Sequence, residues 1–280
     1  MNTNILKRLY LGVKPIGHTF IFELKKQWKK FVAFSIITVG LIFLASWLPY
    51  ALFPGNSLPA IQTEFFRTNQ NFLSLILIFA NCFFFSGIIC SEYDKETGFI
   101  LFPKINKYKL IVGKYIGSYV FVMGITGVFY FTLGMLGLFY YGGPLDIRFF
   151  HSFGIALLYI LAVSSFITFF SSFMKKENMT IVTTILILLI GFNVISQFVV
   201  LANPDIEPLY SLQYAGNLIS SILYLEFPDS VAERYTQIDI RNFTFRTWNT
   251  PTIMAGVSIM LIYTFISLLL AAIIFKRRQL

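Results

Sequence analysis

Residues 90–98, which read CSEYDKETG, form a compact polar segment between two long apolar runs. Up to Tyr115, the polar insert carries three of the chain's thirteen carboxylates and five of its twenty-two Lys and Arg residues. A loop that only reversed the chain between two apolar helices would need far fewer residues than the stretch from Ser91 to Lys114. The length and charge of the insert therefore predict a docking surface.

The composition places the chain among membrane proteins. Hydrophobic residues make up 56% and charged residues 12%, and a mean hydropathy of +0.72 is too apolar for a soluble globular domain. The two cysteines, Cys82 and Cys90, lack the spacing of a metal site or a disulfide framework, so we expect packed thiols. No catalytic, metal or cofactor-binding residue is predicted.

Six apolar runs are long enough to cross the roughly 30 Å of a bilayer's hydrocarbon core, which takes about 20 helical residues. None of them contains Asp, Glu, Lys or Arg, which argues against a proton-coupled carrier and a voltage sensor. The expected fold is all-α, a polytopic membrane protein with six transmembrane helices. The predicted spans are about 31–53, 72–90, 115–141, 149–173, 179–202 and 252–275.

The distribution of cations predicts the orientation. With the N-terminus inside the cell, seventeen of the twenty-two Lys and Arg residues fall on inner segments and five on outer segments. Because cytoplasmic loops of membrane proteins carry the excess of Lys and Arg, both termini are predicted to be cytoplasmic in a multi-pass plasma-membrane protein. The net charge of +9 is then mostly a matter of topology, and no nucleic acid is expected as a partner.

Residues 1–30 lack the features of a cleaved signal peptide. Phe20, Leu24 and Trp28 recur near helical spacing, while Lys25, Lys26, Lys29 and Lys30 fall on other faces of the helix. This pattern predicts a cytoplasmic amphipathic helix at the membrane interface, preceding a transmembrane domain over 31–280. A basic flank that only orients the first span is the alternative.

Two features inside the spans and one outside them are further candidates. Asn193 and Gln197 lie one helical turn apart and are expected to face a substrate path or a second subunit, unless they only hydrogen-bond a neighbouring helix. Gly113 and Gly117 favour close helix packing, within the bundle or at a dimer seam. The outer loop over 203–251 is expected to form a lid or a structural cap, with its leucines on one face of a helix.

Glu92 ends the second span, an acidic turn runs to Thr97-Gly98, Pro103 and Asn106-Lys107 follow, and Gly113-Lys114-Tyr115 opens the third span. With these residues the segment resembles the ABC-2 family of ABC transporter permeases. Glu23-Leu24-Lys25-Lys26 is similar to the family's connecting helix. The resemblance implies an ABC-2, type V exporter-like bundle and a coupling helix at about 91–102 that docks an ATPase subunit. The residues implied in coupling are Glu92, Asp94, Glu96, Thr97, Gly98 and Phe102.

The sequence has no G-x-x-x-x-G-K-[ST] motif to cradle ATP phosphates, so the chain is expected not to be an enzyme. His18 and His151 fall on opposite sides of the predicted membrane and do not suggest an intramembrane active site. The resemblance implies a cytoplasmic ABC ATPase in two copies, with ATP-Mg bound there. It also implies a permease homodimer, or a paired second permease, that handles substrate between its subunits.

The charge-free spans, in a chain with 33 Phe and 15 Tyr residues, suit an apolar or amphipathic substrate. Because the family mostly exports, the predicted function is the permease subunit of an ATP-driven exporter. The alternative is a membrane anchor or assembly scaffold for an extracellular enzyme, without transport.

Overall fold

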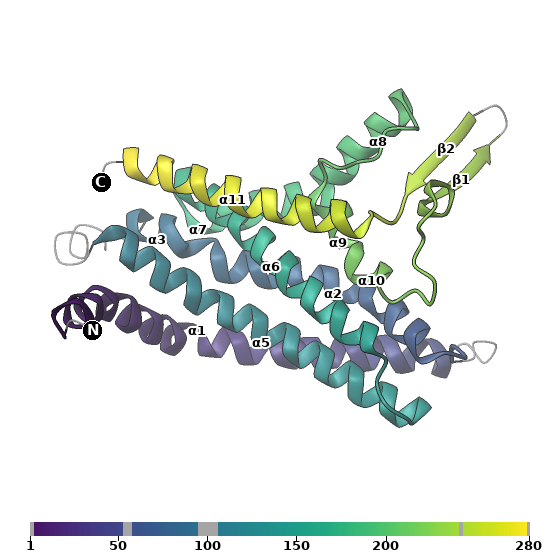
Figure 1. Cartoon of the computed structure of the whole chain (residues 1–280), viewed down its shortest axis with the longest axis horizontal. Coiled ribbons are helices and arrows are strands. Elements are labelled where there is room, and N and C mark those ends of the chain that lie inside the picture. The colour runs from purple at the N-terminus through teal and green to yellow at the C-terminus, as the bar shows by residue number, and fades with distance from the viewer. Residues whose placement is uncertain (1–2, 53–57, 95–105, 241–242, 279–280) are drawn as a thin grey trace.

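The computed structural model describes residues 3–52, 58–94, 106–240 and 243–278. Within these ranges, six helices are long and apolar enough to cross a membrane, which confirms the predicted all-α polytopic class. Helix α1 begins and α11 ends at the same end of the bundle, which we call the termini end (Figure 1). The opposite end, which carries the two strands, is called the hairpin end. The six helices are Lys14–Trp47, Phe72–Asp94, Lys107–Tyr141, Ile147–Phe173, Glu177–Ala202 and Ile253–Arg277.

The elements follow one another mostly as long helices. Short helices and one antiparallel strand pair, with Tyr235 opposite Trp248, occupy the segment between the fifth and sixth spans. The helices are α1 (Thr3–Leu52), α2 (Gln62–Phe85), α3 (Gly87–Asp94), α5 (Lys107–Tyr141), α6 (Ile147–Phe173), α7 (Glu177–Leu186), the π-helical turn η1 (Ile187–Gly191), α8 (Phe192–Ala202), α9 (Leu212–Gly216), α10 (Leu218–Ser221), the 3-10 helix η2 (Val231–Arg234) and α11 (Ile253–Arg277). The strands are β1 (Tyr235–Ile240) and β2 (Phe243–Trp248).

Several helices extend beyond the predicted spans. The amphipathic segment and the first span form one helix, α1, because no Gly or Pro interrupts the chain where they join at Lys30. Helix α2 begins ten residues before Phe72, and α5 begins at Lys107, where the side chain of Asn106 caps its first turn at 3.0 Å. The spans are therefore longer than their charge-free cores.

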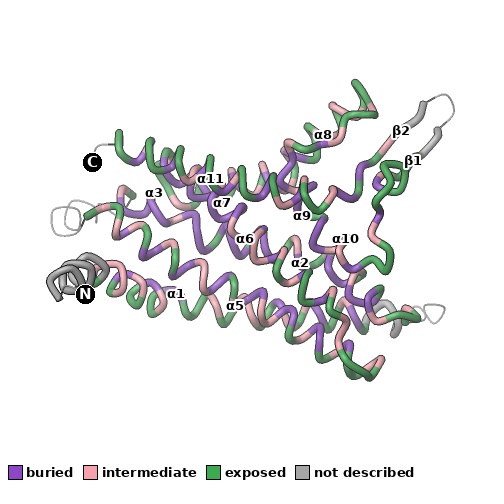
Figure 2. The backbone as a smooth tube through the Cα atoms, viewed as in Figure 1, coloured by how far each residue is buried: buried purple, intermediate pink, exposed green. Residues whose placement is uncertain are grey.

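The apolar core lies where α2, α5 and α6 meet, and buried residues recur along the length of these helices (Figure 2). Phe66 and Phe149 stack with ring centroids 4.5 Å apart, and the Tyr130 ring lies 5.1 Å from that of Phe149. Helix α1 packs along α5, and α11 packs along α6. The bundle thus has a buried centre with α1 and α11 on its flanks.

Two glycines bring α1 against α5. A Cβ atom built on Gly113 would lie 2.7 Å from the Thr19 Cβ and 2.8 Å from the Ile16 carbonyl oxygen, and one on Gly117 would lie 3.1 Å from the Glu23 Cβ. The Gly-x-x-x-Gly spacing therefore serves packing within this chain.

The fifth span is the least embedded of the six. Only 11% of its apolar stretch is buried inside the structure, and α8 leans away from the other helices (Figure 1). The π-helical turn Ile187–Gly191 interrupts it just before α8 begins. Exposed side chains such as Ile195 and Phe198 face outward from α8. This span is covered either by lipid or by another subunit.

We expect Gly113→Ala to lower the free energy of unfolding by about 1–3 kcal/mol, because the new methyl group overlaps the backbone of α1. Gly127→Ala, in the same helix, is the matched control: nothing lies within 4 Å of its added Cβ, and alanine favours the helix. Thermal unfolding in detergent measures both. Equal midpoints for the two variants would show that α1 does not pack closely on Gly113.

Candidate functional site

The residues predicted to function lie at both ends of the bundle. At the termini end, Glu92 of α3 forms an ion pair with Lys114 of α5, and the Lys114 Nζ lies 3.5 Å from the Ser91 hydroxyl. Both charged side chains are buried, with 5% and 6% of their surface exposed. Removing either partner would leave an uncompensated buried charge, so the pair fixes α3 on α5.

The ion pair changes how Glu92 can act. The sequence analysis expected its carboxylate to face a cation on another protein, whereas the structure turns it inward to Lys114. Any coupling role of Glu92 would be indirect, through Lys114. Asp94, at the end of α3, is exposed. The other residues predicted for coupling, Glu96, Thr97, Gly98 and Phe102, lie outside the described residues, and their role stays a prediction.

The last turn of α3 is also tied to α11 and α6. The Arg278 guanidinium lies 3.9 Å from the centroid of the Tyr93 ring and donates a 2.9 Å hydrogen bond to the Ser172 carbonyl. The Phe275 ring contacts the Tyr93 ring edge-on, with the ring centroids 6.5 Å apart. The Lys107 Nζ atom of α5 lies 4.9 Å from the centroid of the Phe275 ring. In the sequence, Arg278 was a topology signal and Lys107 a topology signal and part of the family resemblance, and neither indicated these contacts.

A second polar cluster joins α1 to the same region. Gln27 donates hydrogen bonds to a Glu23 carboxylate oxygen and, at 3.2 Å, to the Ser118 hydroxyl of α5, which donates to the Phe84 carbonyl at 3.1 Å. Glu23 and Gln27 are 3% and 4% exposed. The buried Glu23 carboxylate is therefore held by Gln27 of its own helix, and Gln27 in turn connects it to Ser118 of α5.

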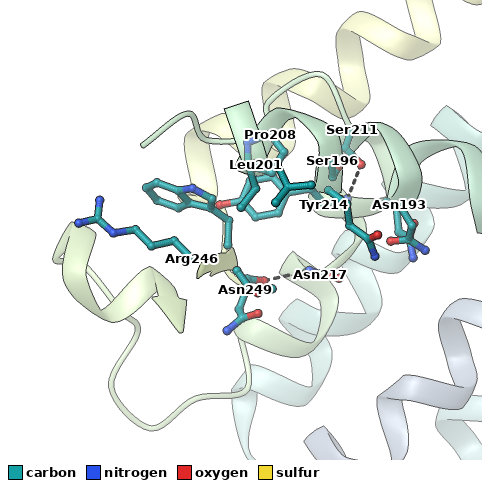
Figure 3. A pocket seen from close by; sticks show the side chains of 14 residues that line it. Asn193, Ser196, Leu201, Pro208, Ser211, Tyr214, Asn217, Arg246 and Asn249 are labelled. Carbon is teal, nitrogen blue, oxygen red and sulfur yellow. Dashed lines mark hydrogen bonds between the residues drawn. The ribbon is translucent and has the colours of Figure 1, made fainter. Parts of the chain in front are cut away.

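At the hairpin end, a pocket of about 460 Å³ opens between α8, the segment around α9, and β2 (Figure 3). Asn193 and Gln197 both line it, so the structure brings together the two amides that the one-turn spacing singled out. The Asn193 amide donates to the Leu189 carbonyl of its own helix at 2.7 Å. This hydrogen bond thus stays within the fifth span and does not reach a neighbouring helix.

The pocket lining combines amides, aromatic rings and apolar side chains. Gln213 contributes a buried side-chain oxygen that has no hydrogen-bond partner among the described residues. Arg246, the charged residue of the lining, pairs with Asp205. The site can therefore exchange hydrogen bonds with a neutral polar group. The described lining is Asn193, Ser196, Gln197, Val200, Leu201, Pro208, Ser211, Gln213, Tyr214, Asn217, Arg246, Thr247, Trp248 and Asn249.

A second buried ion pair anchors the segment behind the pocket. Arg234 pairs with Glu207 and donates to the Thr250 carbonyl at 3.1 Å. The Tyr214 hydroxyl lies 2.9 Å from a Glu207 carboxylate oxygen and 2.8 Å from the Thr250 carbonyl oxygen. Burial, reinforced by the adjacent Glu207 carboxylate, raises the pKa of Tyr214 well above its ordinary value, so the phenol stays protonated at neutral pH.

The leucines of the outer loop were expected on one face of a helix lying on the membrane or capping the extracellular mouth, and the structure divides this segment between the short helices α9 and α10. Leu212 and Leu218 are fully buried, as part of α9 and α10, against the bundle. A Cβ on Gly256 of α11 would lie only 2.8 Å from Leu218 Cδ2. The first half of the loop is therefore a packed cap, and the second half forms the strand pair.

The comparison with known families agrees with this arrangement. Residues 61–280 match the model of the ABC-2 family transporter proteins, a region that holds α2 to α11 and both polar ends described above. No curated protein matches the chain. Since the matched region covers most of the 280 residues, the chain belongs to the ABC-2 transporter family and is a membrane permease subunit of an ABC transporter.

Proposed function

We propose that this permease is the membrane subunit of an ABC exporter and that a separate ATPase docks on its termini end. The observation that carries the proposal is the fixation of α3 by the buried Glu92–Lys114 pair and by Arg278. A force applied beyond Asp94 reaches α5 and α11 directly, because α3 is bound to both. The sequence itself holds no P-loop, so the ATP-Mg complex belongs to the partner.

The mechanism we propose is mechanical. Closure of two ATPase copies on nucleotide displaces the coupling segment at about 91–102, and α3 carries the movement into the bundle. Within the described part of the coupling segment, Asp94 has an exposed carboxylate that can contact cations of the ATPase. Glu96 follows it in the sequence. Such surface pairs set the register and specificity of docking more than its strength.

The orientation follows from the charges and the fold together. The four inner segments predicted to be basic include the beginning of α1, the start of α5, the α6–α7 turn and the end of α11, and these helix ends gather at the termini end (Figure 1). We therefore infer that the termini end is cytoplasmic in the plasma membrane and that the hairpin end is extracellular.

The substrate we propose is amphipathic, with a neutral polar group. The pocket supports this because its amides and hydroxyls adjoin lipid-facing side chains of α8, of which Leu201 is 64% exposed. The weakly embedded fifth span supports a pair of permeases, either a homodimer or a pairing with a second permease, with the substrate handled between them. Export is the direction proposed.

Loss of Lys114 is expected to be more harmful than loss of the whole ion pair. Lys114→Met leaves Glu92 charged and buried and should lower the free energy of unfolding by about 3–5 kcal/mol. The double variant Glu92→Gln/Lys114→Met should recover most of this loss, and unfolding midpoints in detergent compare the three proteins. Additive losses in the double variant would contradict a direct pairing.

Docking is tested by co-expressing the permease with a candidate soluble ABC ATPase and purifying by a tag on the permease. We expect the ATPase to be retained by the wild type and its affinity to fall about tenfold in Asp94→Asn/Glu96→Gln. Glu64→Gln, an exposed carboxylate at the hairpin end, is the control. Absence of any ATPase on the wild type would remove the motor and leave the scaffold function.

The pocket is tested with decyl maltoside, a neutral amphipathic probe, added to permease in lipid nanodiscs. In a Trp28→Phe/Trp47→Phe background, Trp248 is the remaining tryptophan and reports on the pocket by its fluorescence. Asn193→Leu/Gln197→Leu should weaken binding about tenfold, while Asn178→Leu, an exposed amide at the other end of the same span, should not. Equal binding of decyl sulfate would refute selection for a neutral group.

A further inference from the structure

The second span is interrupted at Ser86, between α2 and α3. Ser86 keeps helical backbone angles, φ −55° and ψ −39°, so the interruption is confined to a single turn. In an uninterrupted helix the Ile89 amide donates to the carbonyl of Phe85. Here it donates to the hydroxyl oxygen of Ser171, which belongs to α6, at 3.1 Å.

One side chain of α6 thus serves the backbone of another helix. The Ser171 hydroxyl accepts from the amides of Ile89 and Cys90, both at 3.1 Å, and donates to the Ser86 carbonyl at 2.6 Å. Ser171 and Ser86 are fully buried. A side chain inserted into the hydrogen-bond ladder is a known cause of helix kinks. The three bonds therefore place the break at this level of α6.

At the break, not every buried polar group has a hydrogen-bond partner among the described residues. The Ser86 hydroxyl is buried and has no hydrogen-bond partner among the described residues. Gly87 leaves room for the Glu177 side chain of α7, since a Cβ atom there would lie 2.9 Å from the Glu177 carboxyl carbon. A buried polar atom without a partner is costly, so this turn has a bond to gain from a different arrangement.

Beyond the break, α3 is a short helix that is held at both of its ends. Its first turn is held by Ser171, and its last turn by Lys114 and Arg278. Arg278 also donates to the carbonyl of Ser172, the residue next to Ser171. Helix α6 therefore contacts the first turn of α3 through Ser171. Through the Ser172 carbonyl, it also contacts Arg278, which holds the last turn of α3.

We propose that Ser171 is a positioning residue that forms the pivot of α3, so that displacement of the segment after Asp94 turns α3 about Ser86 against α6. This inference rests on the proposed function, because it assigns the site where movement of the ATPase enters the bundle. The bonds from Ile89 and Cys90 to Ser171 are the ones that change as α3 turns.

Hydrogen exchange of the permease in nanodiscs, read by mass spectrometry at the amides of Ile89 and Cys90, tests the pivot without requiring transport. Ser171→Ala should speed their exchange about tenfold, because both amides lose their acceptor. Ser171→Thr keeps a hydroxyl and should restore the slow rate. Ser172→Ala is the matched control, because its hydroxyl donates to Phe169 in its own helix at 2.6 Å.

The wild-type complex gives a second measurement that does not depend on how a variant folds. On addition of a non-hydrolysable ATP analogue, exchange at Ile89 and Cys90 should change about fivefold or more, while residues 73–85 of α2 stay unchanged. In Ser171→Ala the ATPase should remain bound to the permease, but this nucleotide-dependent change and permease-stimulated ATP hydrolysis should be lost. Only a pivot, and not mere packing, predicts this combination with rescue by Thr.

The outcomes distinguish a failure of the Ser171 pivot from a failure of the proposed exporter function. If the ATPase is retained but nucleotide leaves the two amides unchanged, or if Ser171→Ala matches Ser172→Ala, the pivot is refuted and the exporter function stands. If the wild type retains no ATPase, the proposed function fails, and the pivot falls with it. Retention on the tag is therefore measured before exchange.

Discussion

The termini end depends on one electrostatic constraint, the burial of Glu92 and Lys114 as a pair. Neither charge is tolerable alone in a site that water does not reach, since desolvation of an unpaired ion costs several kcal/mol. Helix α3 must therefore lie on α5 whenever the bundle is folded. Around this fixed contact, Arg278 closes α11 over Tyr93, and the Gln27–Ser118 hydrogen bond attaches α1 to α5.

An ion pair also fixes the hairpin end, where it holds a different part of the chain. Arg234 and Glu207 form a second ion pair with little exposure, and it holds the strand pair to the segment before α9. Between the two ends, the described core is aromatic and aliphatic, with Ser and Thr hydroxyls bonded mainly to backbone carbonyls. The charges are thus confined to the ends, where they fix attachments, and the middle packs through apolar side chains and neutral polar groups such as Tyr130 and Ser152.

Hydropathy was sufficient to predict the six spans because crossing a bilayer requires a long apolar run, whatever the run packs against. Helical spacing likewise predicted that Asn193 and Gln197 share a surface, and both line the pocket. The partner of Glu92 was not predictable, because a charge next to an apolar run has the same sequence pattern whether it faces water or a buried lysine. Ser171 is similarly hidden: a serine inside a span gives no sign of the helix it bonds. The strand pair escaped notice within a loop whose leucines suggested a helix.

Two sides of the pocket, at α9 and at α8, are held with unequal strength. The α9 side continues into α10, which is bonded to α6, where Ser152 donates to the Ile219 carbonyl at 2.6 Å and bonds Tyr130 of α5 at 2.8 Å. The α8 wall follows a π-helical turn and belongs to the span with the least burial. Helices α5 and α6 each run without interruption between the two ends. In the proposed mechanism, a displacement that enters at α3 would therefore move the α9 side of the pocket with the bundle, while α8, which has few buried residues, need not follow. The pocket would then change shape because one side is carried and the other is not.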